Sequence, residues 1–168
     1  MKTFEAITQF GKMLHNLDNW IVKAEAHATA KKFEVDLIAT ERLAPDMYPF
    51  VKQVQATCDS AKFTAAYLSG TEAPKHPDTE KTIAECRARI KSCLAYLETL
   101  TESSFAGAEE RKVAPPWLQG KWVKGDAYLL QMAVPNFYFH VTTAYAILRS
   151  NGVDVGKMDY IGGIPVQG

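Results

Sequence analysis

The sequence lacks an excess of charge of either sign. Lysine plus arginine and aspartate plus glutamate each number 19 among 168 residues, so the formal net charge is zero. Neither sign forms a long block, whereas nucleic acids and anionic membranes are bound by basic stripes or clusters. We therefore expect neither nucleic acid nor a membrane surface as a partner.

Cysteine is scarce and has no metal-site or redox spacing. Cys58, Cys86 and Cys93 contain no C-x-x-C pair, and each falls on an apolar helical stripe, where a thiol packs as a small hydrophobic side chain. The first 20 residues carry acidic and amide side chains where a signal peptide needs an apolar run. We expect a cytoplasmic protein with inert core thiols.

Several catalytic motifs are also absent. The chain contains no Glu-x-x-His pair of the di-iron bundles, no H-E-x-x-H, no P-loop, no G-x-G-x-x-G and no G-x-S-x-G. These absences argue against the corresponding metal, nucleotide and serine-nucleophile chemistries.

Apolar residues recur at three- and four-residue spacings, which is typical of amphipathic helices. This pattern predicts helices over residues 3–29, 34–43, 46–68 and 83–100. Asp46 is the expected N-cap of the second long helix, and Asp78 or Thr79 that of the third. Arg89 falls outside the apolar stripe of its helix, and His76 falls in the proline-containing loop before that helix, so we expect both to be solvated.

Residues 127–148 contain no Asp, Glu, Lys or Arg, which predicts a last helix buried almost all round. The length would allow a membrane span, but polar residues through the segment favour a central helix of a bundle. Pro135 removes one backbone donor and leaves the carbonyl of Gln131 without its usual partner. Asn136 and His140 stand four residues apart, and therefore share one helical face.

A long connection, residues 101–125, precedes this last helix and should contain a short hairpin around residues 118–121. Trp117 and Trp122 flank the turn and either close the open end of the core or form a docking surface; we favour closure. The elements predict an all-α fold, a four-helix bundle, as a single domain over 1–168 with a tail at 152–168 that is extended or partly mobile.

Buried polar groups in a bundle need partners, because an unpaired one costs roughly 1–3 kcal/mol. Asn136 and His140 are such groups, and Gln55 and Asp59 form a second polar pair, at i and i+4, on the flank of the second long helix. Together they predict either a hydrogen-bonded layer that fixes helix register or a pocket for a small polar ligand.

The blocks RLAPDMYPFVKQVQATCDSAK at 42–62 and PNFYFHVTTAYAILRSNGVDVGKMDY at 135–160 resemble the DinB/YfiT-like superfamily, in a branch without assigned function. The resemblance covers nearly the whole chain. It implies an up-and-down-type four-helix bundle, often a homodimer. In active members three histidines bind a divalent metal, and some members are thiol-dependent transferases or hydrolases.

The histidine pattern departs from that of the metal-binding relatives. His140 stands nine residues before Arg149 and matches the second histidine of their last helix, whereas Asn136 stands where the first should be. The ligand from the second helix would fall near Gln55. Amide oxygens are poor ligands for zinc and nickel. The resemblance therefore implies a degraded metal site of His140, Asn136 and Gln55 that holds zinc or nickel weakly or holds no metal.

Two functions remain open. The chain is a small-ligand-binding or non-catalytic bundle with a pocket at Gln55, Asp59, Asn136 and His140. Alternatively, it is a divalent-metal-dependent transferase or hydrolase that acts on a small molecule, with His140 as metal ligand or general base, and that uses a thiol as some members of the superfamily do. The missing histidines favour the first function.

Overall fold

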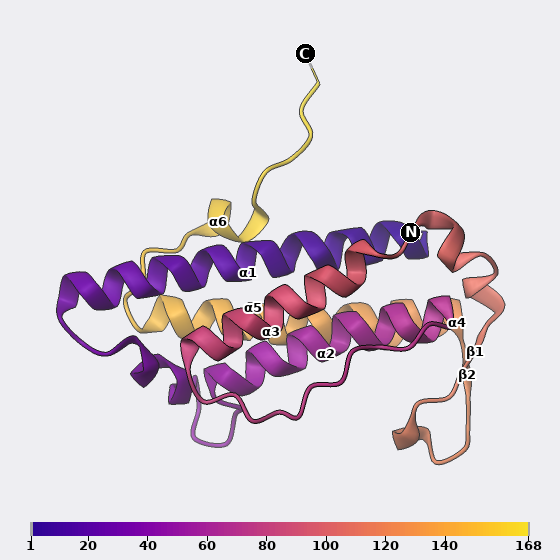
Figure 1. Cartoon of the computed structure of the whole chain (residues 1–168), viewed down its shortest axis with the longest axis horizontal. Helices are drawn as coiled ribbons and strands as arrows, with labels where there is room; N and C mark the ends of the chain where they lie inside the picture. Colours follow the sequence, from indigo (N-terminus) through magenta and orange to yellow (C-terminus); the bar gives the residue numbers. More distant parts are fainter. Residues whose placement is uncertain (1, 168) are drawn as a thin grey trace.

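Long helices span the segments in which apolar residues recur at helical spacing (Figure 1). The computed structural model describes residues 2–167. Its α-helices are α1 (Thr3–Lys31), α2 (Phe50–Ser69), α3 (Ile83–Glu98), α4 (Gly125–Tyr128), α5 (Val134–Ser150) and α6 (Lys157–Ile161). Shorter elements are the 3-10 helices η1 (Val35–Thr40), η2 (Glu102–Phe105), η3 (Ala108–Glu110) and η4 (Pro116–Leu118), the π-helical turn η5 (Leu129–Ala133), and strands β1 (Lys112–Val113) and β2 (Val123–Lys124).

The all-α class and the four-helix bundle are confirmed. The buried side chains of α1, α2, α3 and α5 form one continuous hydrophobic core. Phe10 of α1 stacks on Phe137 of α5 at a centroid distance of 4.1 Å, near the middle of this core. In the part of the chain that the structure describes, no helix has the length and apolar character that crossing a bilayer requires.

Two predicted helix starts are wrong. Asp46 is not the N-cap of α2, which begins at Phe50 with Pro49 in the capping position. A proline disfavours helical geometry in the residue before it, so Tyr48 lies outside the helix. Helix α3 begins at Ile83 rather than at Asp78 or Thr79, because Thr82 forms a capping box with Glu85.

Helices α1 and α5 run parallel, as do α2 and α3. In the first pair Phe10 contacts Phe137, and ten residues later Trp20 contacts Tyr145. In the second pair both helices start near η1. This order differs from the up-and-down arrangement that the resemblance implies. Parallel neighbours need a crossover, and residues 71–82 provide it as an extended segment that runs along the bundle (Figure 1). We call this segment the strap.

The predicted hairpin is present before the last helix. Strands β1 and β2 pair antiparallel, with Val113 opposite Val123. The predicted closure of the core by the two tryptophans is wrong, because Trp117 is 57% and Trp122 52% exposed. Core closure comes instead from smaller groups, among them the buried Val113.

The tail contains a helix that the glycine-rich sequence did not predict. Helix α6 is held against α1: the indole N–H of Trp20 donates to the carbonyl of Asp159 at 2.9 Å. The amide of Asn16 donates to the carbonyl of Tyr160 at 2.9 Å, and Lys23 pairs with the carboxylate of Asp159 at 2.6 Å. Between Gly162 and residue 167 the chain forms no helix or strand.

Candidate ligand site

Helices α2 and α5 lie side by side and antiparallel, and the segment before α5 contains a π-helical turn. The N–H of Val134 donates to the carbonyl of Leu129, five residues back. Pro135 has no N–H to give to Gln131, so the regular α-helical hydrogen-bond pattern cannot continue through this turn. The π turn inserts an extra residue relative to the α-helical register. Leu129 and Ala133 therefore face the core, whereas Leu130 faces solvent.

The prediction that this segment is buried almost all round is consequently wrong. Three of its apolar side chains are well exposed: Leu130 at 54%, Met132 at 37% and Phe139 at 57%. The absence of charge does not reflect burial alone. It leaves an uncharged, partly apolar surface on this segment, of which Met132 lines a cavity together with residues of α2.

His140 contacts Gln53 rather than Gln55. Its Nδ1 lies 2.8 Å from Oε1 of Gln53, and Nε2 of the same amide donates to the carbonyl of Tyr48 at 3.1 Å. With the amide so oriented, Nδ1 of His140 must carry the proton and donate to the amide oxygen. The ring lies nearly parallel to that of Tyr48, and burial lowers the pKa of His140. The imidazole is therefore neutral at pH 7, with Nε2 as an acceptor.

The four residues predicted for the site separate into three places. His140 lies with Gln53, while the amide of Gln55 donates to Glu80 of the strap at 2.8 Å. Asp59 and Asn136 both line a cavity between α2 and α5. The structure thus brings Asp59 and Asn136 together and directs Gln55 away from His140.

The cavity that Asp59 and Asn136 share has a volume of about 530 Å³. Its walls are mainly aromatic and aliphatic, and the polar groups at its surface include the Asp59 carboxylate, the Asn136 amide and the Ser60 hydroxyl. Four aromatic side chains contribute to it: Phe63, Tyr67, Trp117 and Tyr128. Within residues 2–167 the side chain of Asn136 has no hydrogen-bond partner. Small-molecule sites commonly combine a mostly apolar wall with a few polar groups of this kind.

Asp59 also belongs to an ion cluster that adjoins the cavity. Its Oδ1 lies 2.6 Å from the guanidinium of Arg89 and 2.8 Å from Nζ of Lys62. Arg89 pairs in addition with Asp78 at 2.6 Å and Glu80 at 3.0 Å, both in the strap. These contacts fasten the strap to α2 and α3.

The sequence reasoning missed both cations of this cluster. Arg89 is 3% and Lys62 2% exposed, whereas Arg89 was expected in solvent. His76 is also not simply solvated: Nδ1 lies 2.8 Å from Nζ of Lys62 and Nε2 3.0 Å from the hydroxyl of Ser92. Burial lowers the pKa of His76, and the charges of Lys62 and Arg89 lower it further. A signal was present, since Arg89 stands three residues after Cys86 and four before Cys93, both on the apolar stripe.

The residues near His140 do not fit a tightly bound zinc or nickel ion. Across residues 2–167 there is no group of three or more His, Cys, Asp or Glu side chains arranged to hold a metal. Gln53 offers an amide oxygen that already accepts a hydrogen bond from His140. The three cysteines are buried elsewhere in the core. One imidazole nitrogen and amide oxygens make a weak donor set for these ions.

Comparison with known proteins shows the family of this chain. Residues 4–161 match the model of the family described as a domain of unknown function, DUF1993. The chain belongs to this family. The crystal structure of a DinB family member protein from Shewanella denitrificans is similar to the DUF1993 chain, with a TM-score of 0.94 and 46% sequence identity over 98% of this chain and 94% of that chain. The resemblance to the DinB-like superfamily is thereby confirmed. No curated protein matches the DUF1993 chain.

Proposed function

We propose that this DUF1993 protein is a cytoplasmic small-molecule-binding bundle whose site is the cavity between α2 and α5. The main observation that supports this proposal is a cavity of about 530 Å³ with four aromatic side chains in its walls and the unpaired amide of Asn136. Aromatic walls favour a flat ligand, and the amide offers it both a donor and an acceptor. The ligand class is therefore a flat, mostly apolar molecule with one polar group, less polar than the sequence suggested.

The chemistry of the site supports binding rather than catalysis. His140 is neutral but lies beyond the cavity lining, one helical turn after Asn136. The Asp59 carboxylate is already engaged in ion pairs with two cations, Lys62 and Arg89. The cysteines, the strongest nucleophiles in the sequence, are buried in the core. These features leave no activated nucleophile at the cavity.

The proposal is tested with N-phenyl-1-naphthylamine, a neutral, flat fluorescent probe. Trp117→Ala removes a wall of the cavity and should weaken probe binding at least about tenfold, which corresponds to about 1.4 kcal/mol. Trp122→Ala is the matched control, because Trp122 is similarly exposed on the same hairpin but does not line the cavity. Equal affinities of the two variants would refute the site. Mass spectrometry of the untagged protein under native conditions then identifies ligands that co-purify.

Elemental analysis distinguishes the metal-dependent alternative from the binding proposal. Stoichiometric zinc, nickel, iron or manganese in the untagged protein, lost in His140→Ala, would replace the binding proposal with a metal-dependent transferase or hydrolase. Substrate screening would then begin with low-molecular-weight thiols.

A further inference from the structure

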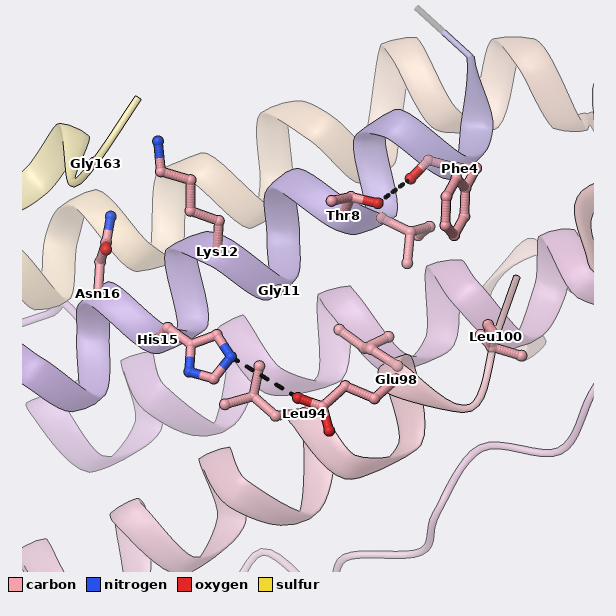
Figure 2. Close-up of a pocket in the computed structure, with 12 residues that line it drawn as sticks. Phe4, Thr8, Gly11, Lys12, His15, Asn16, Leu94, Glu98, Leu100 and Gly163 are labelled. Carbon is pink, nitrogen blue, oxygen red and sulfur yellow. Dashed lines mark hydrogen bonds and ion pairs between the residues drawn. The ribbon is translucent and has the colours of Figure 1, made fainter. Parts of the chain in front are cut away.

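A second hollow of the surface crosses α1 between α3 and the C-terminal tail, away from the α2–α5 cavity. We call it the α1 groove, and its volume is about 510 Å³. Its apolar lining comes from Phe4, Ile7, Leu94, Leu97 and Leu100. Figure 2 shows Phe4 and Leu100 near one end of the groove and Asn16 and Gly163 near the other. The groove therefore has an apolar end and a polar end.

The polar end carries a cation without an ion-pair partner. Within residues 2–167 Lys12 makes no salt bridge, and its side chain points to the side of α1 on which Gly163 lies (Figure 2). His15 points across to Glu98 of α3, with Nε2 at 3.9 Å from the carboxylate. Of the described lining residues only Glu98 is acidic, and it lies on the other side of α1 from Lys12. An anionic group beside Lys12 would therefore meet an unpaired cation.

Gly11 lies between the two ends of the groove, in the interior of α1. Glycine inside a helix is less favourable than alanine, and a packing neighbour usually explains its presence. Here a Cβ at Gly11 would meet nothing within 4 Å. The internal packing of the chain therefore gives no reason for glycine, and the bare backbone leaves room for a chain of methylene groups to lie directly on α1.

We propose that the α1 groove binds a medium-chain carboxylate, with its carboxylate at Lys12 and its alkyl chain over Gly11 on the apolar lining. The dimensions agree. From Phe4 to Lys12 the groove follows eight residues of α1, which is about 12 Å at about 1.5 Å per residue. An extended alkyl chain with C–C bonds of about 1.5 Å advances about 1.3 Å per bond, so about ten carbons fill this length. The site is separate from the α2–α5 cavity and does not depend on the function proposed for that cavity.

The tail of the same chain supplies a cover for the alkyl chain. Gly163 already forms part of the groove wall, while Ile164 is 64% and Val166 82% exposed. When residues 164–167 are extended, these two side chains share a face, and the segment spans about 13 Å at about 3.3 Å per residue. On the empty groove two aliphatic side chains gain little more than the entropy lost on ordering the tail, which points away from the bundle in Figure 1. A bound alkyl chain adds the apolar surface that the tail needs to close.

The first test titrates the full chain with sodium decanoate by isothermal titration calorimetry. We expect one site, and an affinity that rises about fourfold per methylene from octanoate to decanoate, which corresponds to about 0.8 kcal/mol. Gly11→Leu places a side chain where the alkyl chain lies and should raise the dissociation constant at least about tenfold. Ala26→Leu, at an exposed position on α1 outside the groove, is the matched control and should leave it unchanged. Absence of binding to the unmodified chain, or equal affinities of the two leucine variants, overturns the proposal.

The second test examines the carboxylate. Lys12→Gln should weaken octanoate binding about fivefold, the effect of losing one ion pair near solvent, and should leave the binding of 1-octanol unchanged. Lys52→Gln is the matched control, because Lys52 is an exposed lysine of α2 that lies outside the groove. Octanoate binding that is equally strong in both variants, or an equal loss for octanoate and 1-octanol in Lys12→Gln, would contradict the position of the carboxylate.

The third test examines the cover. The double variant Ile164→Gln/Val166→Gln keeps the length of the tail but removes its apolar edge, and should raise the dissociation constant for decanoate at least about fivefold. An unchanged affinity would show that the tail does not close over the ligand and would overturn this part of the proposal.

The last test separates the α1 groove from the α2–α5 cavity. Decanoate should not displace N-phenyl-1-naphthylamine, and Trp117→Ala should bind decanoate as tightly as the unmodified chain, because Trp117 lines only the α2–α5 cavity. Displacement of the probe, or loss of decanoate binding in Trp117→Ala, would place decanoate in the α2–α5 cavity and would refute the second site. Failure of probe binding alone refutes the function proposed for the cavity and leaves the decanoate result standing.

Discussion

Replacing Arg89 with alanine tests whether the strap cluster stabilises the fold. The guanidinium is 1% exposed as a side chain and pairs with Asp59 at 2.6 Å, Asp78 at 2.6 Å and Glu80 at 3.0 Å. Arg89→Ala leaves these three carboxylates without their shared cation. We therefore expect a large loss in the free energy of unfolding at pH 7.

The size of the loss depends on how far each carboxylate can regain water. The side chain of Asp78 is 47% exposed and becomes solvated at little cost, while Asp59 keeps Lys62 at 2.8 Å. Glu80 is 11% exposed and retains only the amide of Gln55 as a side-chain partner. Removing one partner of a buried ion pair costs about 3–5 kcal/mol. With one strongly affected carboxylate, we expect about 3 kcal/mol.

Arg87→Ala is the matched control, in the same helix and with two carboxylate partners. The side chain of Arg87 is 25% exposed, and its partners Asp18 and Glu25 are 20% and 36% exposed. An ion pair this close to solvent contributes about 1 kcal/mol or less. Urea unfolding followed by circular dichroism gives both values. A loss for Arg89→Ala no larger than that for Arg87→Ala would refute the reasoning.

The pH dependence of stability provides an independent test of the same ion cluster. Burial by itself raises the pKa of Glu80, but hydrogen bonds from backbone, Arg89 and Gln55 outweigh it, and the pKa is lowered overall. A carboxyl with a lowered pKa stabilises the folded state above its unfolded pKa, and this contribution is lost as pH falls through the folded value. Arg89→Ala removes much of that contribution. The stability gap between wild type and variant should therefore narrow from pH 7 to pH 4, and a gap that stays constant would contradict the assignment.

Three further outcomes follow from burial. Gly125→Ala should lower stability by about 1–3 kcal/mol in urea unfolding, because its Cβ would overlap the carbonyl oxygen of Ala108; a neutral effect would contradict this packing. Burial lowers the pKa values of His140 and His76, so the unfolded chain binds more protons and stability should fall as pH drops below about 6.5. The double variant His140→Gln/His76→Gln should flatten this dependence, and a flat wild-type profile between pH 7 and 5.5 would argue against it. The native protein should not react with Ellman's reagent, whereas three thiols should react in urea, because all three cysteines are buried and burial raises the pKa of Cys86 to about 12; one fast native thiol would contradict this.

The fold could be predicted because the sequence pattern that determines it is local and is repeated along each helix. Each long helix carries an apolar stripe over several turns, so errors at single positions do not change the assignment. The helix starts failed at Asp46 and Asp78 because single capping residues are weak signals beside a proline or a capping box. The parallel order of α2 and α3 is not local information, since it depends on which way the strap runs.

The candidate site was harder to predict than the fold, because its residues are far apart in the sequence. Gln53 and His140 are separated by 87 positions, and no spacing rule pairs them. Periodicity assigned Arg89 to solvent, since a pattern of apolar residues cannot show that three acidic side chains will surround a cation. The π turn before Pro135 also shifted the exposed face of the last helix by one residue. The missing donor at Pro135 was evident, but its structural consequence was not.

Helix geometry explains how the polar face of α2 divides between two roles. Successive residues of an α-helix are rotated by about 100°, so Gln53 and Gln55 point in nearly opposite directions, whereas Gln55 and Asp59 differ by about 40°. Gln53 meets His140 of α5, and Gln55 meets the strap. Asp59 lies at the boundary, because its carboxylate pairs with Arg89 while it also lines the α2–α5 cavity. A ligand that contacts Asp59 therefore touches the cluster that fastens the strap, and occupancy of the cavity should change the stability of the strap as well as that of the site.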